Sequence, residues 1–271
     1  MLSTSQFKKI GVGVVALGLV LGAFIYISTP KAQALESLSS IQPGDLVRGQ
    51  SFSAVYYMGK DGFRYVFPNQ KTYDTWYSNF DDVKFISDSD LGKIQIGGNV
   101  TYRPGVRMIK IDTDPATYAV AANGTLRHVT SEAVATALYG ANWNQHIDDV
   151  PDGFFTNYSI GDAIESASDY SPATETAAAT TINGDKGLQA PAEISITDSG
   201  YSPIEVNIDA GASVRFTNNG TTKHTATADD LSWGTGTLQP GQTYVQTFDE
   251  AGTYGFFDSY DSANTGAVFA N

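Results

Sequence analysis

The side chains that could bind metals or act as nucleophiles are few in this chain. Of its 271 residues, three are histidine and none is cysteine. Without a thiol, the chain forms no disulfide, and a copper site that depends on a cysteine thiolate is excluded. His128 and His146 are 18 residues apart, a spacing that matches no metal-binding motif. We expect both to be ordinary surface or satisfied polar residues.

Catalytic signatures are absent as well. The sequence contains no Gly-x-Ser-x-Gly, no His-Glu-x-x-His and no phosphate-binding Gly-x-x-x-x-Gly-Lys. Paired acids that resemble glycosidase acids occur at Asp81-Asp82, Asp88/Asp90 and Asp148-Asp149. They lie in expected turns, without the apolar surroundings that make one carboxyl a general acid. We therefore expect no enzymatic activity.

The C-terminal region, residues 191–271, has the pattern of a β-sandwich. Apolar residues alternate with polar ones, which places one face of each strand in a core. The alternating pairs are Ile194/Ile196, Val206/Ile208 and Val214/Phe216.

This region resembles the cupredoxin family of plastocyanin- and pseudoazurin-like proteins. The resemblance is carried by Tyr201-Ser-Pro203, Val214-Arg-Phe216-Thr-Asn218, Leu238-Gln-Pro240-Gly241 and the run from Gly252 through Asp258 and Asp261 to Asn264. It implies a Greek-key sandwich of seven or eight strands. It also places His224 at the first copper histidine, whereas Asp258, Asp261 and Asn264 stand where the family has its copper cysteine, second histidine and methionine.

If the family geometry holds, His224, Asp258, Asp261 and Asn264 meet at one end of the sandwich. An imidazole, two carboxylates and an amide suit a hard or borderline ion such as zinc or manganese. Asp and Asn are also common in solvated turns, and Lys223 beside His224 disfavours a cation. We therefore expect no bound metal and no cofactor. A metal-binding carrier or electron-transfer component that works through His224 is the alternative.

The N-terminus has the pattern of an export signal. Lys8 and Lys9 precede an unbroken apolar run of eighteen residues, 10–27, which is followed by Ala32-Gln33-Ala34. A basic start, an apolar core and a small-x-small site predict a signal peptide over residues 1–34. The run is close to the lower limit for spanning a bilayer, so an uncleaved membrane anchor is the alternative. In both cases we expect the rest of the chain to be extracellular or on the cell surface.

Residues 40–164 contain a duplicated unit, with copies at 40–103 and 104–164. Pro43-Gly44 and Pro104-Gly105 open the copies, and Asp61-Gly62 corresponds to Asn123-Gly124. Asp-Gly and Asn-Gly between apolar runs predict β-hairpins, and Ser131 is an expected helix N-cap. We predict helices over 70–77 and 132–139. The unit resembles a secreted bacterial surface-protein repeat with no assigned chemistry, which implies an adhesive or spacer role.

Six aromatic residues lie close together in the first copy. They are Phe63, Tyr65, Tyr73, Trp76, Tyr77 and Phe80. Exposed rings could stack on sugars, and a glycan-binding module is therefore one interpretation. A small module also needs large side chains for its core, and the second copy lacks most of these rings, which favours core packing.

Composition predicts a linker between the repeats and the sandwich and disfavours some classes of partner. Residues 165–190 are mostly small and polar, which predicts a flexible linker. Removal of residues 1–34 leaves 13 basic and 29 acidic residues, a net charge of −16 that disfavours nucleic acid and anionic membranes as partners. We expect a mostly β fold with two tandem hairpin-plus-helix α+β repeats and a Greek-key cupredoxin-like β-sandwich. The expected function is structural or weak recognition of cell-surface proteins or glycans, with membrane contact only through an uncleaved N-terminal segment.

Overall fold

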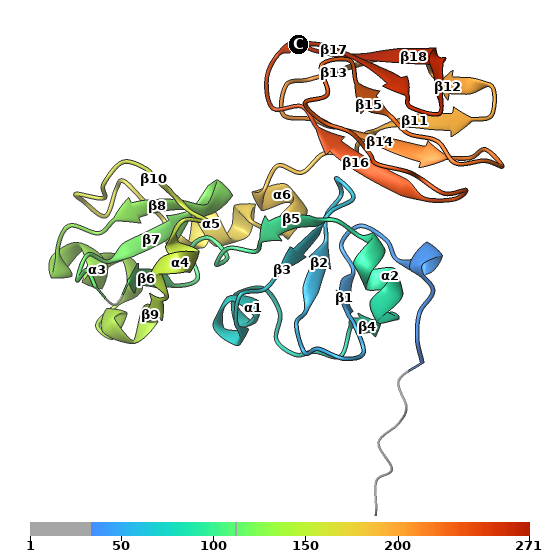
Figure 1. The fold of residues 1–271 in the computed structure, drawn as a ribbon. Helices are drawn as coiled ribbons and strands as arrows, with labels where there is room; N and C mark the ends of the chain where they lie inside the picture. Colours follow the sequence, from blue (N-terminus) through green and yellow to red (C-terminus); the bar gives the residue numbers. More distant parts are fainter. Residues whose placement is uncertain (1–33, 112) are drawn as a thin grey trace, which may run out of the picture. The chain divides into compact units, whose positions relative to one another are not determined.

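A computed structural model describes residues 34–111 and 113–271, and over these residues the fold is mostly β with short helices (Figure 1). The expected signal segment lies outside the described residues. Within the described part, no helix is both long enough and apolar enough to cross a membrane.

Residues 40–103, called module 1, form one five-stranded sheet with two helices. Strands β1, β2 and β3 pair antiparallel, and β4 and β5 add in parallel at the two edges, giving the order β4-β1-β2-β3-β5. A 3-10 turn, η1 (Leu38–Ser40), precedes the sheet. The elements are β1 (Leu46–Arg48), β2 (Tyr56–Met58), β3 (Arg64–Val66), α1 (Gln70–Trp76), β4 (Val83–Phe85), α2 (Asp88–Lys93) and β5 (Ile96–Asn99).

Residues 104–164, called module 2, repeat this topology. Strands β6, β7 and β8 pair antiparallel, β9 lies parallel to β6, and β10 lies parallel to β8. The elements are β6 (Met108–Ile111), β7 (Tyr118–Ala121), η2 (Ala122–Gly124), β8 (Thr125–His128), α3 (Glu132–Tyr139), η3 (Trp143–His146), β9 (Ile147–Val150), α4 (Asp152–Phe155) and β10 (Ser159–Ile160).

The hairpin registers of the two modules agree residue for residue. Tyr56 pairs with Val66 in module 1, and Tyr118 pairs with His128 in module 2. In module 2, Asn123 and Gly124 both have φ 63°, as the sequence predicts, whereas in module 1 Gly62 has φ +91° and Asp61 lies outside the left-handed region. Both helices start at a side-chain cap, and α1 and α3 occupy almost the whole of the two ranges expected from the sequence.

Residues 165–190, for which the sequence predicts a flexible linker, instead contain α5 (Pro172–Ala178) and α6 (Ile182–Asp185). Tyr170 is buried in the core of module 2, and its hydroxyl donates a 2.6 Å hydrogen bond to the Val120 carbonyl. Ile182 is buried in the core of module 1. A few apolar side chains therefore anchor a segment whose overall composition is typical of disorder.

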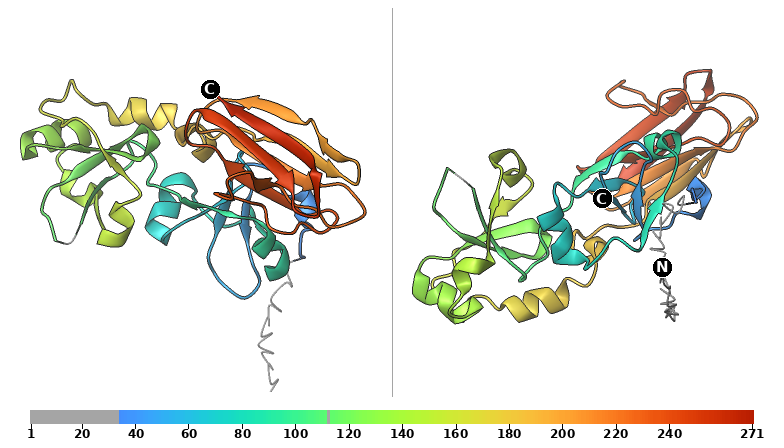
Figure 2. Two further views of the ribbon diagram at one scale, coloured as in Figure 1. Left: turned by 45° about the horizontal axis from the view of Figure 1, so that its top comes forward. Right: turned by 90° about the horizontal axis from the view of Figure 1, so that it is seen from below.

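The C-terminal strands form two four-stranded sheets, seen as orange-to-red layers in Figures 1 and 2. One sheet has the order β12-β11-β14-β16 and the other β13-β18-β17-β15. The strands are β11 (Ala192–Thr197), β12 (Gly200–Ser202), β13 (Glu205–Ile208), β14 (Ser213–Asn218), β15 (Thr227–Ala228), β16 (Thr243–Thr247), β17 (Gly252–Asp258) and β18 (Asp261–Ala270).

The sandwich core follows the alternation seen in the sequence. Ile194, Ile196, Val214 and Phe216 are all almost completely buried, and they share one cluster with Phe256 of β17. Both sheets thus contribute their apolar faces to a single core, as face-to-face packing requires.

The anchoring of residues 165–190 can be tested at Tyr170. Tyr170→Ala removes a buried ring, and we expect it to lower the free energy of unfolding by about 3–5 kcal/mol. Tyr170→Phe removes only the hydroxyl, and we expect a loss of about 1 kcal/mol. Urea unfolding measures both, with Ala167→Ser at an exposed position of the same segment as control. A Tyr170→Ala variant as stable as Ala167→Ser would contradict the anchoring.

Candidate functional site

The histidine expected at the first copper position lies inside the sandwich. The backbone of His224 pairs with Leu238, with N–H to carbonyl distances of 3.1 and 2.9 Å, which fixes the direction of its side chain. The ring passes close to Gly220, where an added Cβ would lie 3.0 Å from Nε2. Glycine at this position therefore leaves room for the imidazole, and His224 is only 6% exposed.

Asp258 holds one side of this ring. His224 Nδ1 lies 2.6 Å from Asp258 Oδ2, and Asp258 is 1% exposed. The other carboxylate oxygen accepts hydrogen bonds from the backbone N–H groups of Thr225 at 3.1 Å and Tyr260 at 3.0 Å. A carboxylate at this depth is tolerated because it is both paired and hydrogen-bonded.

Asp198 holds the other side of the ring, and the sequence analysis did not identify it. Its Oδ1 lies 3.1 Å from His224 Nε2. The carboxylate also accepts hydrogen bonds from the backbone N–H groups and hydroxyls of Thr221 and Thr222. Asp198 is in the turn between β11 and β12, and no local motif relates that turn to His224.

The electrostatics of this cluster favour a charged imidazole. Burial on its own lowers the pKa of His224, but the hydrogen bonds to Asp258 and Asp198 and their negative charges outweigh it, and the net pKa is raised. The backbone and hydroxyl donors of Thr221, followed by the hydroxyl of Thr222, hold the pKa of Asp198 well below its usual range. In the charged form both ring nitrogens are donors, and each has a carboxylate acceptor.

The structure separates the four site residues expected from the sequence into two pairs. A two-residue turn, 259–260, joins β17 to β18, and the register shifts between Phe257 and Asp258. Because the turn is so short, Asp261 and Asn264 belong to strand β18. There the Asn264 amide donates to Asp261 at 3.1 Å, and Asp261 is exposed. His224 and Asp258 are brought together, whereas Asp261 and Asn264 form a separate surface pair.

The donor set does not fit type 1 copper, which needs a cysteine thiolate in the plane of the metal. Asp258 and Asp198 lie on opposite nitrogens of the imidazole, so their oxygens do not converge on one ion. Among the described residues, no group of three or more His, Cys, Asp or Glu side chains has the geometry to hold a metal. Lys223 adds positive charge nearby, with Nζ 4.2 Å from the ring centre of Tyr260.

The aromatic residues considered as a sugar platform lie mainly in the core of module 1. Tyr65 and Tyr73 are buried there, and Phe63, Trp76 and Tyr77 pack against the same cluster. The exposed ring in this set is Phe80, which stacks on Tyr73 with a 4.2 Å centroid distance. These rings therefore fill the module and form no continuous exposed platform.

Comparison with known proteins identifies the fold of this region. A family model described as a cupredoxin-like domain matches residues 173–270, beginning before the expected boundary at 191. The chain is similar to a purple cupredoxin from Nitrosopumilus maritimus, with 23% identity over 30% of this chain and 99% of that one and a TM-score of 0.28. It is similar to amicyanin from Paracoccus versutus, with 26% identity, coverage of 30% and 81%, and a TM-score of 0.28.

A copper-containing nitrite reductase from Thermus scotoductus is also similar, with 21% identity and a TM-score of 0.29. The match covers 31% of this chain but only 23% of that enzyme. No curated protein matches the chain.

The raised pKa of His224 predicts a pH dependence of stability. Because the folded pKa of His224 is raised above its ordinary value of 6.5, the pairing stabilises the fold below pH 6.5 and is lost as pH rises through the folded pKa. We expect the free energy of unfolding to fall on that rise, and His224→Gln to remove this dependence. Urea unfolding across the range measures it, with His146→Gln as control. A pH profile that His224→Gln leaves unchanged would contradict the assignment.

Proposed function

Because residues 173–270 form a cupredoxin-like domain, we propose that this protein uses a cupredoxin fold without copper, as a structural or weak-recognition part of an exported, non-enzymatic cell-surface or extracellular protein. The observation that carries the proposal is the hydrogen bonding of the His224 ring. Both of its ring nitrogens are engaged, at 2.6 Å by Asp258 and at 3.1 Å by Asp198. A metal ion would have to displace one of these carboxylates.

The physical consequence is that a hydrogen-bonded histidine–aspartate pair stands where a metal would otherwise join the strands. In a metal site, the ion links ligands from separate segments and stabilises the fold through its binding free energy. In this chain, the imidazole connects the segment before β15 with Asp258 on β17 and Asp198 beside β11. The domain can therefore keep these segments together without a metal.

The alternative, a divalent-ion carrier or electron-transfer component, would use His224 as its ligand. It would require the ring to lose its proton and one carboxylate partner, and no cysteine is available to set a blue-copper potential. The raised pKa of His224 opposes the loss of its proton, and the hydrogen bonds that raise it oppose the loss of a carboxylate partner.

Export is supported by the sequence pattern of the N-terminus, where Lys8 and Lys9 precede the apolar run 10–27. The excess of acidic over basic residues supports partners other than nucleic acid. We propose cell-surface proteins or glycans as its partners.

A metal titration tests the proposal. We expect purified protein mixed with Cu(II) to show no intense thiolate charge-transfer band. We also expect no rise in melting temperature with copper, zinc, manganese or calcium, because a ligand that does not bind the native state does not stabilise it. Differential scanning calorimetry measures the melting temperature. A metal-dependent rise that is lost in His224→Ala but kept in His146→Ala would overturn the proposal.

A further inference from the structure

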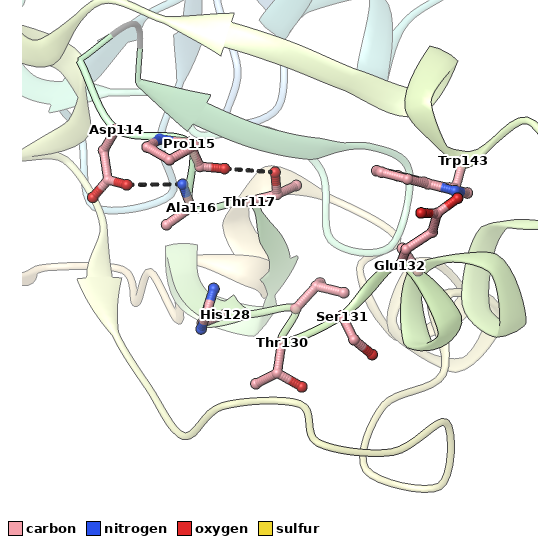
Figure 3. A pocket seen from close by; sticks show the side chains of 11 residues that line it. Asp114, Pro115, Ala116, Thr117, His128, Thr130, Ser131, Glu132 and Trp143 are labelled. Carbon is pink, nitrogen blue, oxygen red and sulfur yellow. Dashed lines mark hydrogen bonds between the residues drawn. The ribbon is translucent and has the colours of Figure 1, made fainter.

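Module 2 contains a pocket of about 410 Å³ between the loop 114–117 and the start of α3. Figure 3 shows Trp143 and Glu132 on one side of this pocket and Asp114 and Thr117 on the other. Its volume lies in the range of small-molecule sites, ~300–1,000 Å³. The pocket is distinct from the His224 cluster, because its lining residues all belong to module 2.

At one position of the pocket lining, module 2 has a small side chain where module 1 has a buried ring. In the shared register, Ala135 of α3 corresponds to Tyr73 of α1. Tyr73 is 2% exposed and stacks on Phe80, with a centroid distance of 4.2 Å and an interplanar angle of 12°. In module 2 the segment after the helix supplies Trp143 instead, and no side chain at position 135 can stack on it. Ala135 and Trp143 both line the pocket.

The surroundings of this space are polar in module 2 and mainly apolar in module 1. Four lining residues of module 2 differ from their counterparts in module 1: Thr117 replaces Val55, His128 replaces Val66, Thr130 replaces Pro68 and Glu132 replaces Gln70. Buried Val129 and Ala135 keep an apolar floor. An apolar floor with a polar rim suits a ring-shaped ligand that carries hydroxyl groups at its edge.

Three polar groups of the rim can bind a ligand. Within the described residues, no hydrogen bond to the protein is made by the imidazole of His128, the carboxylate of Glu132 or the indole N–H of Trp143. The His128 ring lies beside the Tyr118 ring, with a centroid distance of 5.6 Å. In contrast, the indole N–H of Trp76 in module 1 donates to the Thr101 carbonyl at 2.9 Å. Together the three free groups provide both donors and acceptors.

We propose that this pocket of module 2 binds a neutral pyranose sugar, stacked on Trp143 and hydrogen-bonded to Glu132 and His128. Charge excludes anionic sugars, since the lining contains Asp114 and Glu132 but no lysine or arginine. A quaternary ammonium ion favours a cage of several aromatic rings, whereas Trp143 is the one tryptophan, tyrosine or phenylalanine in this lining. The proposal names a ligand class for the recognition role proposed above, but it does not depend on whether the C-terminal domain binds a metal.

An NMR titration tests this site on the full chain. The probes are methyl pyranosides of glucose, galactose, mannose and N-acetylglucosamine at millimolar concentrations, with choline as the cationic probe. The chain has three tryptophans, and Trp143→Phe identifies the Trp143 indole signal. We expect at least one pyranoside to shift this signal while the signals of Trp76 and Trp233 stay in place. We expect Glu132→Gln to weaken binding about tenfold, because a hydrogen bond to a charged group is lost.

Two variants connect the shift to the pocket. Ala135→Tyr introduces the side chain that fills module 1, and we expect it to abolish binding. Asp74→Asn, an acid-to-amide change on the exposed side of α1, should leave binding unchanged. If the NMR spectrum of Ala135→Tyr shows that this variant is unfolded, the affinity of Glu132→Gln is compared with that of Asp74→Asn instead. The proposal is overturned if no pyranoside shifts the Trp143 signal, if choline alone shifts it, or if Glu132→Gln binds as tightly as Asp74→Asn.

Discussion

The buried pair of His224 and Asp258 is the interaction on which the account of the C-terminal domain depends. A carboxylate that is 1% exposed is stable only with charged or hydrogen-bonding partners, and the imidazole is one of them, beside the backbone N–H groups of Thr225 and Tyr260. Removing either side chain takes away the shortest hydrogen bond of the other, at 2.6 Å, and leaves it with its remaining partners, the Thr225 and Tyr260 N–H groups for Asp258 and Asp198 for His224. The same ring reaches the turn that contains Asp198, so one side chain connects three segments of the cupredoxin-like fold.

The two modules show how one topology can be filled by different side chains. Each sheet has the same strand order and the same hairpin register, so the backbone of the unit is set by its turns and strands. Module 1 fills its core with Tyr73, stacked on Phe80. Module 2 has Ala135 at the corresponding position, and Ala135 lines a pocket with a polar rim. A fold that remains stable when one ring is absent can provide a binding site at that position.

Sequence reasoning succeeded where the signal is local. Asp61-Gly62 and Asn123-Gly124 predicted the hairpins, and alternating apolar residues predicted the sandwich strands, because turn conformation and strand burial depend on neighbouring residues. It failed where distant residues decide. Tyr170 and Ile182 order a segment of polar composition by entering two different cores. Asp198 reaches His224 only through the fold, and Asp261 and Asn264 leave the site because the turn before them has two residues.

A double-mutant cycle between His224→Gln and Asp258→Asn tests the central claim most directly. If the two side chains form a charged buried pair, their effects on the free energy of unfolding will be non-additive, with a coupling energy between about 1 and 3 kcal/mol. The cycle of His224→Gln with Asp261→Asn, which lies on the separate surface pair, should be additive. Effects of His224→Gln and Asp258→Asn that add within about 0.5 kcal/mol would contradict the account.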